Sequence, residues 1–196
     1  MKRIFLAIVF LFSMLQAALA QEGGWQVQIL GGMFAPFDEE VQNIYGSAPS
    51  LEIALMTPVG RSSRARIWTS FTGRKGDPYY LTDDFYAGNV AELRWFNVGL
   101  WLETSSPRAV HPKVFVGGGM YYVFGREKIT RVSNNRGDGL GVLLGVTTDF
   151  PLSRRLSLAM QANFRFQEMV FRQRKNRYRF NLSGGNVSMG FAYWFK

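Results

Sequence analysis

The stretch that decides the fold is Leu156-Ser157-Leu158-Ala159-Met160-Gln161-Ala162-Asn163-Phe164-Arg165-Phe166-Gln167. Its even-numbered side chains are apolar and its odd-numbered ones are small or polar, which is the two-residue period of a β-strand. The C-terminus repeats the pattern, with Val187, Met189, Phe191, Tyr193 and Phe195 on one face. A strand in a globular protein has about 5–6 residues, whereas a tilted strand needs about 9–11 to cross a bilayer. The length of these stretches therefore predicts membrane-crossing strands.

The chemistry of the second face indicates which face points inward. It carries Gly, Ala, Ser, Asn and Gln, which suit the crowded lumen of a narrow barrel whose large apolar side chains face lipid. Backbone groups in lipid must be satisfied internally, so such a sheet has to close. The alternative fold is a soluble exported barrel that binds an apolar ligand. The tryptophans either form girdles at the membrane interfaces or pack inside the barrel; they are Trp25, Trp68, Trp95, Trp101 and Trp194.

Eight alternating segments are expected, and the connections between them alternate in length. The segments are Trp25–Met33, Ser50–Pro58, Ala65–Gly73, Asn89–Glu103, Lys113–Glu127, Leu140–Phe150, Leu156–Phe171 and Arg179–Phe195. In the fourth, the apolar phase changes after Trp95, which predicts a β-bulge near Trp95-Phe96. Short connections at Gly60–Arg64, Thr104–Pro112 and Pro151–Arg155 are expected in the periplasm. Longer ones are expected outside; they are Phe34–Pro49, Arg74–Gly88, Lys128–Gly139 and Arg172–Tyr178.

The N-terminus predicts export. Met1-Lys2-Arg3 is basic, Ile4–Leu15 is apolar, and Ala18 and Ala20 are the small residues that a signal peptidase reads before Gln21. We expect a signal peptide over residues 1–20 and one domain over 21–196; the alternative is a short helical anchor. The net charge is +9 and there is no cysteine. A basic chain can bind nucleic acid, but an exported one is expected to meet lipopolysaccharide or an anionic membrane instead.

Two motifs resemble a known family. Gly190–Phe195, with aromatic residues at Phe191, Tyr193 and Phe195, resembles the membrane-insertion signal of outer-membrane barrels. Phe150–Leu158 resembles a recurrent periplasmic turn of the small OmpA/OmpX-like outer-membrane proteins. The resemblance implies an all-β fold, an eight-stranded antiparallel up-and-down transmembrane β-barrel, in the outer membrane of a Gram-negative bacterium. We further expect insertion by the barrel-assembly machinery and a monomeric state.

Charged residues are expected on the lumen face. They are Glu52, Arg66, Glu92, Arg94, Glu127 and Arg165. Charges of both signs should pair, because a lone buried charge is very costly. They could line a pore or fill the lumen as an ion-pair network. We favour the network, because eight strands leave an interior just wide enough for side chains.

Evidence for catalysis or for a cofactor is sparse. The single histidine, His111, is expected in a periplasmic turn, with Glu103, Ser105 and Ser106 near it in sequence. Some barrels of this size modify lipid A with a His and a Ser or Glu, but at the external leaflet. No zinc-binding, P-loop or dinucleotide motif is present, so we expect no cofactor. Asp38-Glu39-Glu40 and Asp83-Asp84 could bind a divalent cation or simply be solvated.

The most basic segment is expected to be an external loop. Its cations are Arg172, Arg174, Lys175, Arg177 and Arg179. Guanidinium groups bind phosphate through paired, charge-assisted hydrogen bonds, so the loop either contacts lipopolysaccharide or is merely solvated. The sequence thus predicts a non-enzymatic outer-membrane barrel with a structural or surface-binding role. The alternatives are a lipid A-modifying enzyme and a small-solute channel.

Overall fold

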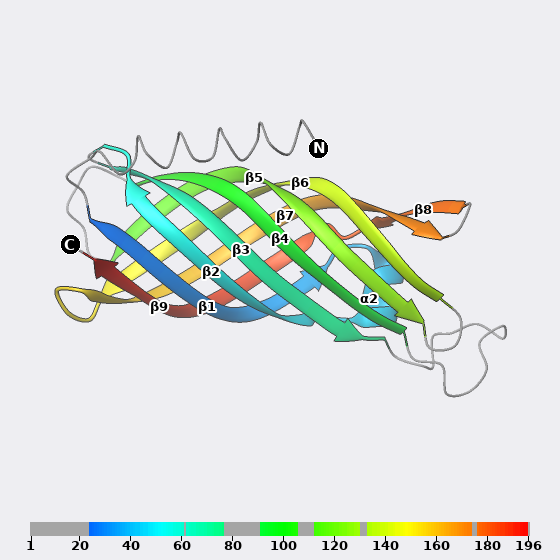
Figure 1. Ribbon diagram of the computed structural model, residues 1–196. Coiled ribbons are helices and arrows are strands. Elements are labelled where there is room, and N and C mark those ends of the chain that lie inside the picture. The colour runs from blue at the N-terminus through cyan, green and yellow to red at the C-terminus, as the bar shows by residue number, and fades with distance from the viewer. Residues whose placement is uncertain are drawn as a thin grey trace.

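The computed structural model describes residues 24–60, 62–76, 91–105, 112–129, 133–173 and 176–195. These residues form antiparallel strands and one short helix (Figure 1). The elements are β1 (Trp25–Pro36), α2 (Glu39–Tyr45), β2 (Ala48–Pro58), β3 (Ser63–Lys75), β4 (Ala91–Ser105), β5 (Lys113–Ile129), β6 (Ser133–Pro151), β7 (Leu156–Gln173), β8 (Asn176–Asn181) and β9 (Gly184–Phe195).

The sheet closes into a barrel of eight strand positions. Neighbouring strands pair from β1 to β7, and β9 pairs with both β7 and β1. Along β7, Leu156 lies opposite Tyr193 of β9, and Glu168 lies opposite Asn181 of β8, in one continuous register. The segments β8 and β9 therefore occupy the same position in the wall, interrupted only at residues 182–183. The predicted eight-stranded antiparallel barrel is confirmed.

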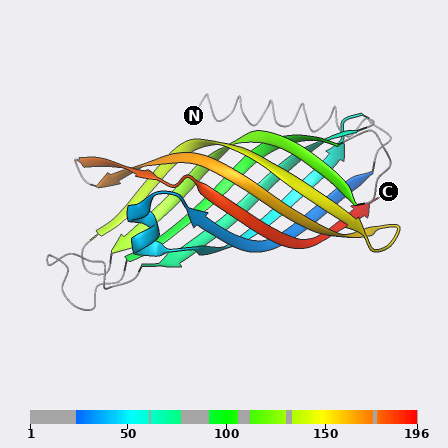
Figure 2. The ribbon, with the colours of Figure 1, turned by 180° about the vertical axis from the view of Figure 1, so that it is seen from behind.

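The two ends of the barrel differ. The turn end carries the β2–β3 and β6–β7 turns, together with the start of β1 and the end of β9 (Figure 1). The loop end carries α2 and the β7–β8 hairpin, as the view from behind also shows (Figure 2). Asp38 caps α2 by accepting a hydrogen bond from the Val41 backbone N–H at 3.1 Å. Its carboxylate, considered above as a cation ligand, thus stabilises the helix N-terminus.

A belt of exposed apolar side chains surrounds the barrel. Leu144, Phe164 and Val187 are 60%, 58% and 65% exposed, while the intervening side chains are buried inside. So large a continuous apolar surface is unstable in water but suited to lipid. The belt therefore indicates that the strands cross a bilayer. No helix among the described residues is long and apolar enough to do so.

The predicted bulge in β4 is wrong. Burial alternates without interruption from Ala91 to Ser105, and β4 keeps continuous register with β3 and β5. Leu93 and Trp95 are therefore inward and buried, and Phe96 is outward. The apolar residues change faces because the surroundings change: beyond the lipid belt, the inside of the barrel is apolar and the outside is polar.

Three of the four predicted external loops are shorter than expected, because β1, β5, β6, β7 and β8 extend beyond the belt, while most of the connection from β3 to β4 lies outside the described residues. The segment from Arg172 to Tyr178 is the tip of a hairpin rather than a loop: β7 runs to Gln173 and β8 starts at Asn176. Phe171 and Tyr178 lie opposite each other and stack, with ring centroids 5.3 Å apart. Such a cross-strand aromatic pair stabilises the extended hairpin.

Candidate functional site

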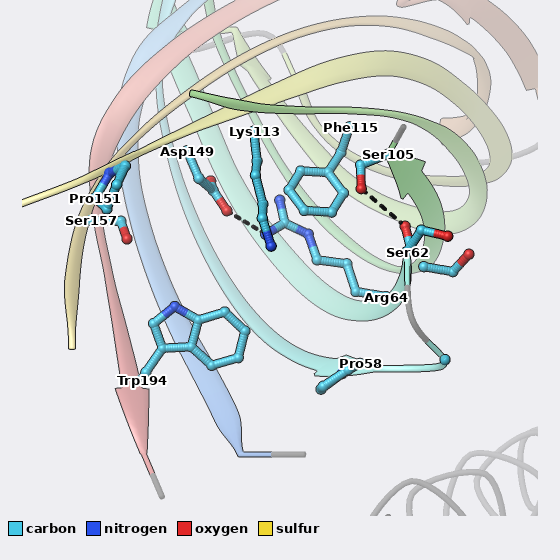
Figure 3. A pocket seen from close by; sticks show the side chains of 12 residues that line it. Pro58, Ser62, Arg64, Ser105, Lys113, Phe115, Asp149, Pro151, Ser157 and Trp194 are labelled. Carbon is cyan, nitrogen blue, oxygen red and sulfur yellow. Dashed lines mark hydrogen bonds and ion pairs between the residues drawn. The ribbon is translucent and has the colours of Figure 1, made fainter. Parts of the chain in front are cut away.

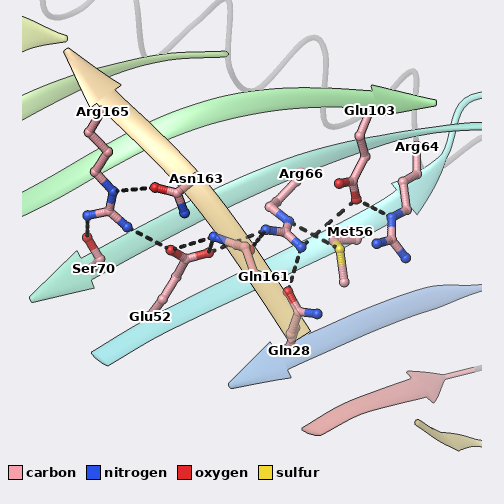
Figure 4. Close-up of polar contacts among 10 residues, drawn as sticks. All are labelled: Gln28, Glu52, Met56, Arg64, Arg66, Ser70, Glu103, Gln161, Asn163 and Arg165. Atoms are coloured by element: carbon pink, nitrogen blue, oxygen red, sulfur yellow. Dashed lines mark hydrogen bonds and ion pairs between the residues drawn. The ribbon is translucent and has the colours of Figure 1, made fainter. Parts of the chain in front are cut away.

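The centre of the lumen is organised around Glu52 of β2 (Figure 4). Its carboxylate accepts hydrogen bonds from Arg66 Nη1 at 3.4 Å and Arg165 Nη2 at 3.1 Å. Gln161 Nε2 donates to the same carboxylate at 3.2 Å. All four side chains are buried. Because they come from β2, β3 and β7, these contacts tie opposite sides of the barrel together.

The charged contacts continue towards the turn end. Arg64 Nε donates to Glu103, and Arg64 Nη1 donates to Asp149. Arg66 Nη2 lies 3.9 Å from the Glu103 carboxylate. Together with the contacts of Glu52, these pairs form an alternating series, the lumen chain, which is Asp149–Arg64–Glu103–Arg66–Glu52–Arg165.

The lumen chain balances its own charge. It contains three guanidinium groups and three carboxylates, each next to a group of opposite sign. Burying a charge is strongly unfavourable unless it is paired and hydrogen-bonded. Alternation meets this requirement at every position, so the barrel can hold six ionised groups within the bilayer.

Aromatic rings fill the space around the lumen chain. The guanidinium carbon of Arg66 lies 4.8 Å from the ring centroid of Trp101, and that of Arg165 lies 5.1 Å from Trp68. Both tryptophans are buried, as is Trp95. Of the two placements considered for the tryptophans, these three therefore adopt the internal one. The rings and the cations on their faces leave the middle of the lumen closed by side chains.

An apolar plug closes the loop end. Its centre includes Phe34, Leu93, Trp95 and Phe171, each at most 3% exposed, with Val41 of α2 packed against them. Phe34 and Trp95 meet edge to face with ring centroids 5.4 Å apart. The helix packs onto this cluster through Val41 and Tyr45, which are both buried.

Glu127 joins α2 to the β7–β8 hairpin. Its carboxylate accepts a hydrogen bond from the Tyr45 hydroxyl at 3.1 Å and a second from the Tyr178 hydroxyl. Burial, reinforced by the nearby Glu127 charge, raises the pKa of Tyr45 well above its usual value. The tyrosine therefore stays a hydrogen-bond donor. Glu127 acts at the apolar plug of the loop end and is not part of the lumen chain.

A half-open cavity of about 330 Å³ occupies the turn end (Figure 3). Lys113, Phe115 and Trp194 line it, and Arg64 and Asp149 form part of its wall. The guanidinium carbon of Arg64 lies 3.7 Å from the Phe115 ring centroid. The cavity is thus a vestibule with mixed charge and aromatic walls, and the first members of the lumen chain lie at its inner side.

Two of the expected lumen residues lie elsewhere. Arg94 and Glu92 form an ion pair on the outer surface of β4, with side chains 58% and 23% exposed. The expectation that they point inward is wrong because β4 has no bulge to change its phase. Glu52, Arg66 and Arg165 lie inside in the lumen chain. Glu127 is also buried, but it lies at the loop end, where Tyr45 and Tyr178 donate hydrogen bonds to it and no cation of the described residues pairs with it.

Three lumen residues were missed by sequence reasoning. Glu103 shares its face with Asn97, so the correct strand phase would have identified it. Asp149 is buried on the same face as Thr147 of β6. Arg64 ends the predicted connection Gly60–Arg64, but β3 begins at Ser63 and includes it. In each case, the signal was the two-residue alternation continued to the end of the strand.

The remaining candidate residues are placed as follows. Phe191, Tyr193 and Phe195 face outward on β9. Arg172, Arg177 and Arg179 are exposed on the β7–β8 hairpin. Glu103 binds Arg64, and Ser105 Oγ donates to the Ser62 carbonyl at 3.3 Å, so both residues near His111 in sequence have other partners. The other candidates lie outside the described residues; they are Ala18, Ala20, Gln21, Asp83, Asp84, Ser106, His111, Arg174 and Lys175.

Comparison with known proteins identifies similar structures but no similar sequences. No family model and no curated protein matches the chain. The outer membrane protein OprG of Pseudomonas aeruginosa is similar in structure, with a TM-score of 0.65 and 11% identity over 88% of this chain and 96% of that one. A major outer membrane protein of Thermus thermophilus has a TM-score of 0.62 and 15% identity, over 89% of this chain and 100% of that one. Neisserial surface protein A has a TM-score of 0.58 and 12% identity, over 88% of this chain and 97% of that one.

These similarities, at such low identity, concern the fold. They agree with the physical evidence from this chain, namely a closed antiparallel sheet, an outward apolar belt and a lumen filled with paired charges. In barrels of this type, the short turns and the chain ends face the periplasm and the longer connections face outward. The turn end is therefore the periplasmic end, and the loop end is the external end. The chain has the fold of the small eight-stranded outer-membrane β-barrels.

Proposed function

We propose that this protein is a non-enzymatic, non-conducting outer-membrane barrel with a structural or surface-binding role at its external end. The observation that carries the proposal is the occupied lumen. A solute entering from the periplasm would reach Arg64 and Asp149, then the Arg66 and Arg165 layer, and finally the apolar plug. Passage would require separating buried ion pairs, each of which is costly to break.

The function is therefore expected to reside on the outer surface. With the interior used for packing, the polar surface beyond the lipid belt is the part of the barrel that meets other molecules. It is formed by the external ends of β4–β7 and by the β7–β8 hairpin. Rigid strand ends of this kind present side chains in fixed positions, which favours recognition.

Planar-bilayer recording tests the proposal directly. Purified protein, reconstituted from detergent alongside a sixteen-stranded porin as a positive control for insertion, is expected to give no stable channel openings. Heat-dependent gel mobility of the same sample verifies that the barrel is folded. Regular, ohmic openings from the folded wild-type protein would overturn the sealed-lumen proposal and favour the solute channel.

The enzyme alternative has a separate test. Mass spectrometry of lipid A from wild-type and deletion strains compares acyl-chain number and phosphate content. We expect identical spectra. A loss or gain of one acyl chain that is restored by the wild-type gene would establish lipid A modification, and substitution of His111 would then identify whether that residue takes part.

A further inference from the structure

Five arginines form a continuous row across the outer surface near the external end. Strand register places Arg94 opposite Arg126, and Arg126 opposite Arg136. Arg136 in turn lies opposite Arg172, and Arg172 opposite Arg177. All five are exposed on the outer face of consecutive strands, from β4 to β8. We call them the arginine row.

Among the described residues, the arginine row carries more positive charge than the neighbouring carboxylates neutralise. Neighbouring strands are about 4.8 Å apart, so five cations extend over roughly 19 Å. Glu92 pairs with Arg94, and Asp138 lies 3.7 Å from Arg172. Arg126 donates to the neutral amide of Asn134 at 2.7 Å. Within the described residues, no carboxylate forms an ion pair with Arg126, Arg136 or Arg177.

Such an arrangement is unfavourable in the isolated protein. Like charges directly opposite each other on adjacent strands destabilise a sheet, and here the opposition occurs four times in succession. Opposite charges could have been placed at these positions, as they are along the lumen chain. The repulsion would be relieved by an anionic ligand with several charges that contacts neighbouring guanidinium groups.

The surface next to the arginine row is apolar. Phe71, Phe96 and Phe124 lie side by side on three neighbouring strands, one outward position deeper in the membrane than Arg94 and Arg126. With Arg94, Arg126 and Arg136 they line a shallow groove on the outer wall. A ligand that fits this groove has an anionic head above and hydrocarbon below.

We infer that the arginine row binds the phosphates of lipid A, the membrane anchor of lipopolysaccharide, with acyl chains lying along the phenylalanines. Lipid A occupies the external leaflet, at the depth where the lipid belt gives way to polar residues. Guanidinium groups bind phosphate oxygens in paired hydrogen bonds. The inference rests on the proposed function for the assignment of the external end and for surface binding. It enlarges the expected basic loop into a site built mainly on strands.

The test compares two variants with equal loss of charge. Arg126→Gln/Arg136→Gln removes the centre of the arginine row. Arg154→Gln/Arg155→Gln removes two exposed arginines from the periplasmic β6–β7 turn. Native mass spectrometry in detergent measures binding of purified bisphosphorylated lipid A. We expect at least a tenfold loss of affinity for the first variant and less than a twofold change for the second. Equal losses would show non-specific attraction and overturn the inference.

Binding of other anionic ligands shows which anion the site prefers. Monophosphorylated lipid A is expected to bind at least tenfold more weakly than the bisphosphorylated form, and inorganic phosphate or phosphatidylglycerol more weakly still. Equal binding of phosphatidylglycerol would indicate a general anionic-lipid surface and would overturn the assignment to lipid A. Conductance is independent of this readout, so an open channel that still binds lipid A would refute only the sealed lumen.

A stability readout guards against misfolding. Without lipid A, Arg126→Gln/Arg136→Gln should be at least as stable to heat as the wild type, because two repelling charges have been removed. Added lipid A should raise the unfolding temperature of the wild type, since a ligand that binds only the folded state stabilises it. Added lipid A should raise the unfolding temperature of the variant much less. An equal rise in both proteins would contradict the site.

Discussion

Replacing Glu52 with glutamine removes the central carboxylate of the lumen chain while preserving side-chain size. Glu52 is 3% exposed, and its carboxylate accepts hydrogen bonds from Arg66 at 3.4 Å and from Arg165 at 3.1 Å. The substitution leaves three buried guanidinium groups facing two carboxylates, Glu103 and Asp149. Removing one partner of a buried pair costs about 3–5 kcal/mol, so we expect the free energy of unfolding to fall by that amount.

A surface pair provides the control. Glu92→Gln breaks the ion pair with Arg94 on the outer wall, where both side chains reach solvent. Exposed pairs contribute about 0–1 kcal/mol, so this variant should be nearly neutral. The double variant Glu52→Gln/Arg165→Met removes one charge of each sign and should recover part of the loss, because buried pairs can often be replaced by apolar side chains.

Urea unfolding in detergent micelles measures all three effects. Tryptophan fluorescence reports the lumen, where Trp68 and Trp101 contact the arginines. Mobility of unboiled samples reports the closed barrel independently. If Glu52→Gln lowered the free energy of unfolding by no more than Glu92→Gln does, the buried network would be refuted, because the lumen chain would then be solvated.

Three smaller perturbations test other parts of the barrel. A Cβ at Gly119 would lie 1.9 Å from the Leu100 carbonyl oxygen, so Gly119→Ala should lower the free energy of unfolding by about 1–3 kcal/mol. Gly31 is the control, because a Cβ there would have no atom within 4 Å. Gly31→Ala should therefore leave the free energy of unfolding unchanged in the same urea titration. Because the pKa of Tyr45 is raised, its contribution to stability is complete below about pH 10 and declines at higher pH, as the unfolded chain loses its proton. The free energy of unfolding measured from pH 8 to 11 should therefore fall with a slope that Tyr45→Phe reduces. An unchanged slope would contradict a Tyr45 hydroxyl that is buried beside Glu127. Phe195→Ala should lower the fraction of folded barrel in outer membranes, measured on unboiled gels, if the terminal strand is the insertion signal.

Strand number and direction could be predicted because lipid imposes a strict pattern. In β7 and β9, each outward side chain faces hydrocarbon and each inward one faces the lumen, so the two-residue period is visible in the sequence. The pattern fails at Trp95-Phe96 for a physical reason. Above the lipid belt, the inside of the barrel becomes an apolar plug and the outside meets polar surroundings, so apolar residues change faces while the strand continues regularly.

The lumen chain could be predicted only in part. Glu52, Arg66 and Arg165 lie within strongly alternating stretches, and their phase is clear. Glu103 and Asp149 lie near strand ends, where alternation merges with turn composition. Which cation meets which carboxylate depends on contacts between strands far apart in the sequence, such as Arg165 with Glu52. A single sequence carries no information on these pairings.

The arginine row is invisible in the sequence for a related reason. Arg94, Arg126, Arg136 and Arg172 are scattered over four strands, and only register brings them to one level. The sequence does show a local cluster of cations from Arg172 onward, but that cluster predicts a basic loop and does not indicate a row across several strands. Register depends on the exact lengths of the connections and hairpins, which the alternation of side chains does not determine.

The most direct test of the inside-out barrel is spin labelling of single cysteines in lipid vesicles, and the chain has no native cysteine to interfere. Labels placed one at a time from Ser157 to Phe166 report collision with oxygen, which dissolves in lipid. We predict high oxygen accessibility at even positions such as Met160 and Phe164, and immobilised, shielded labels at odd positions such as Gln161. The opposite alternation, or protein recovered in solution without detergent, would contradict a barrel whose apolar face meets lipid.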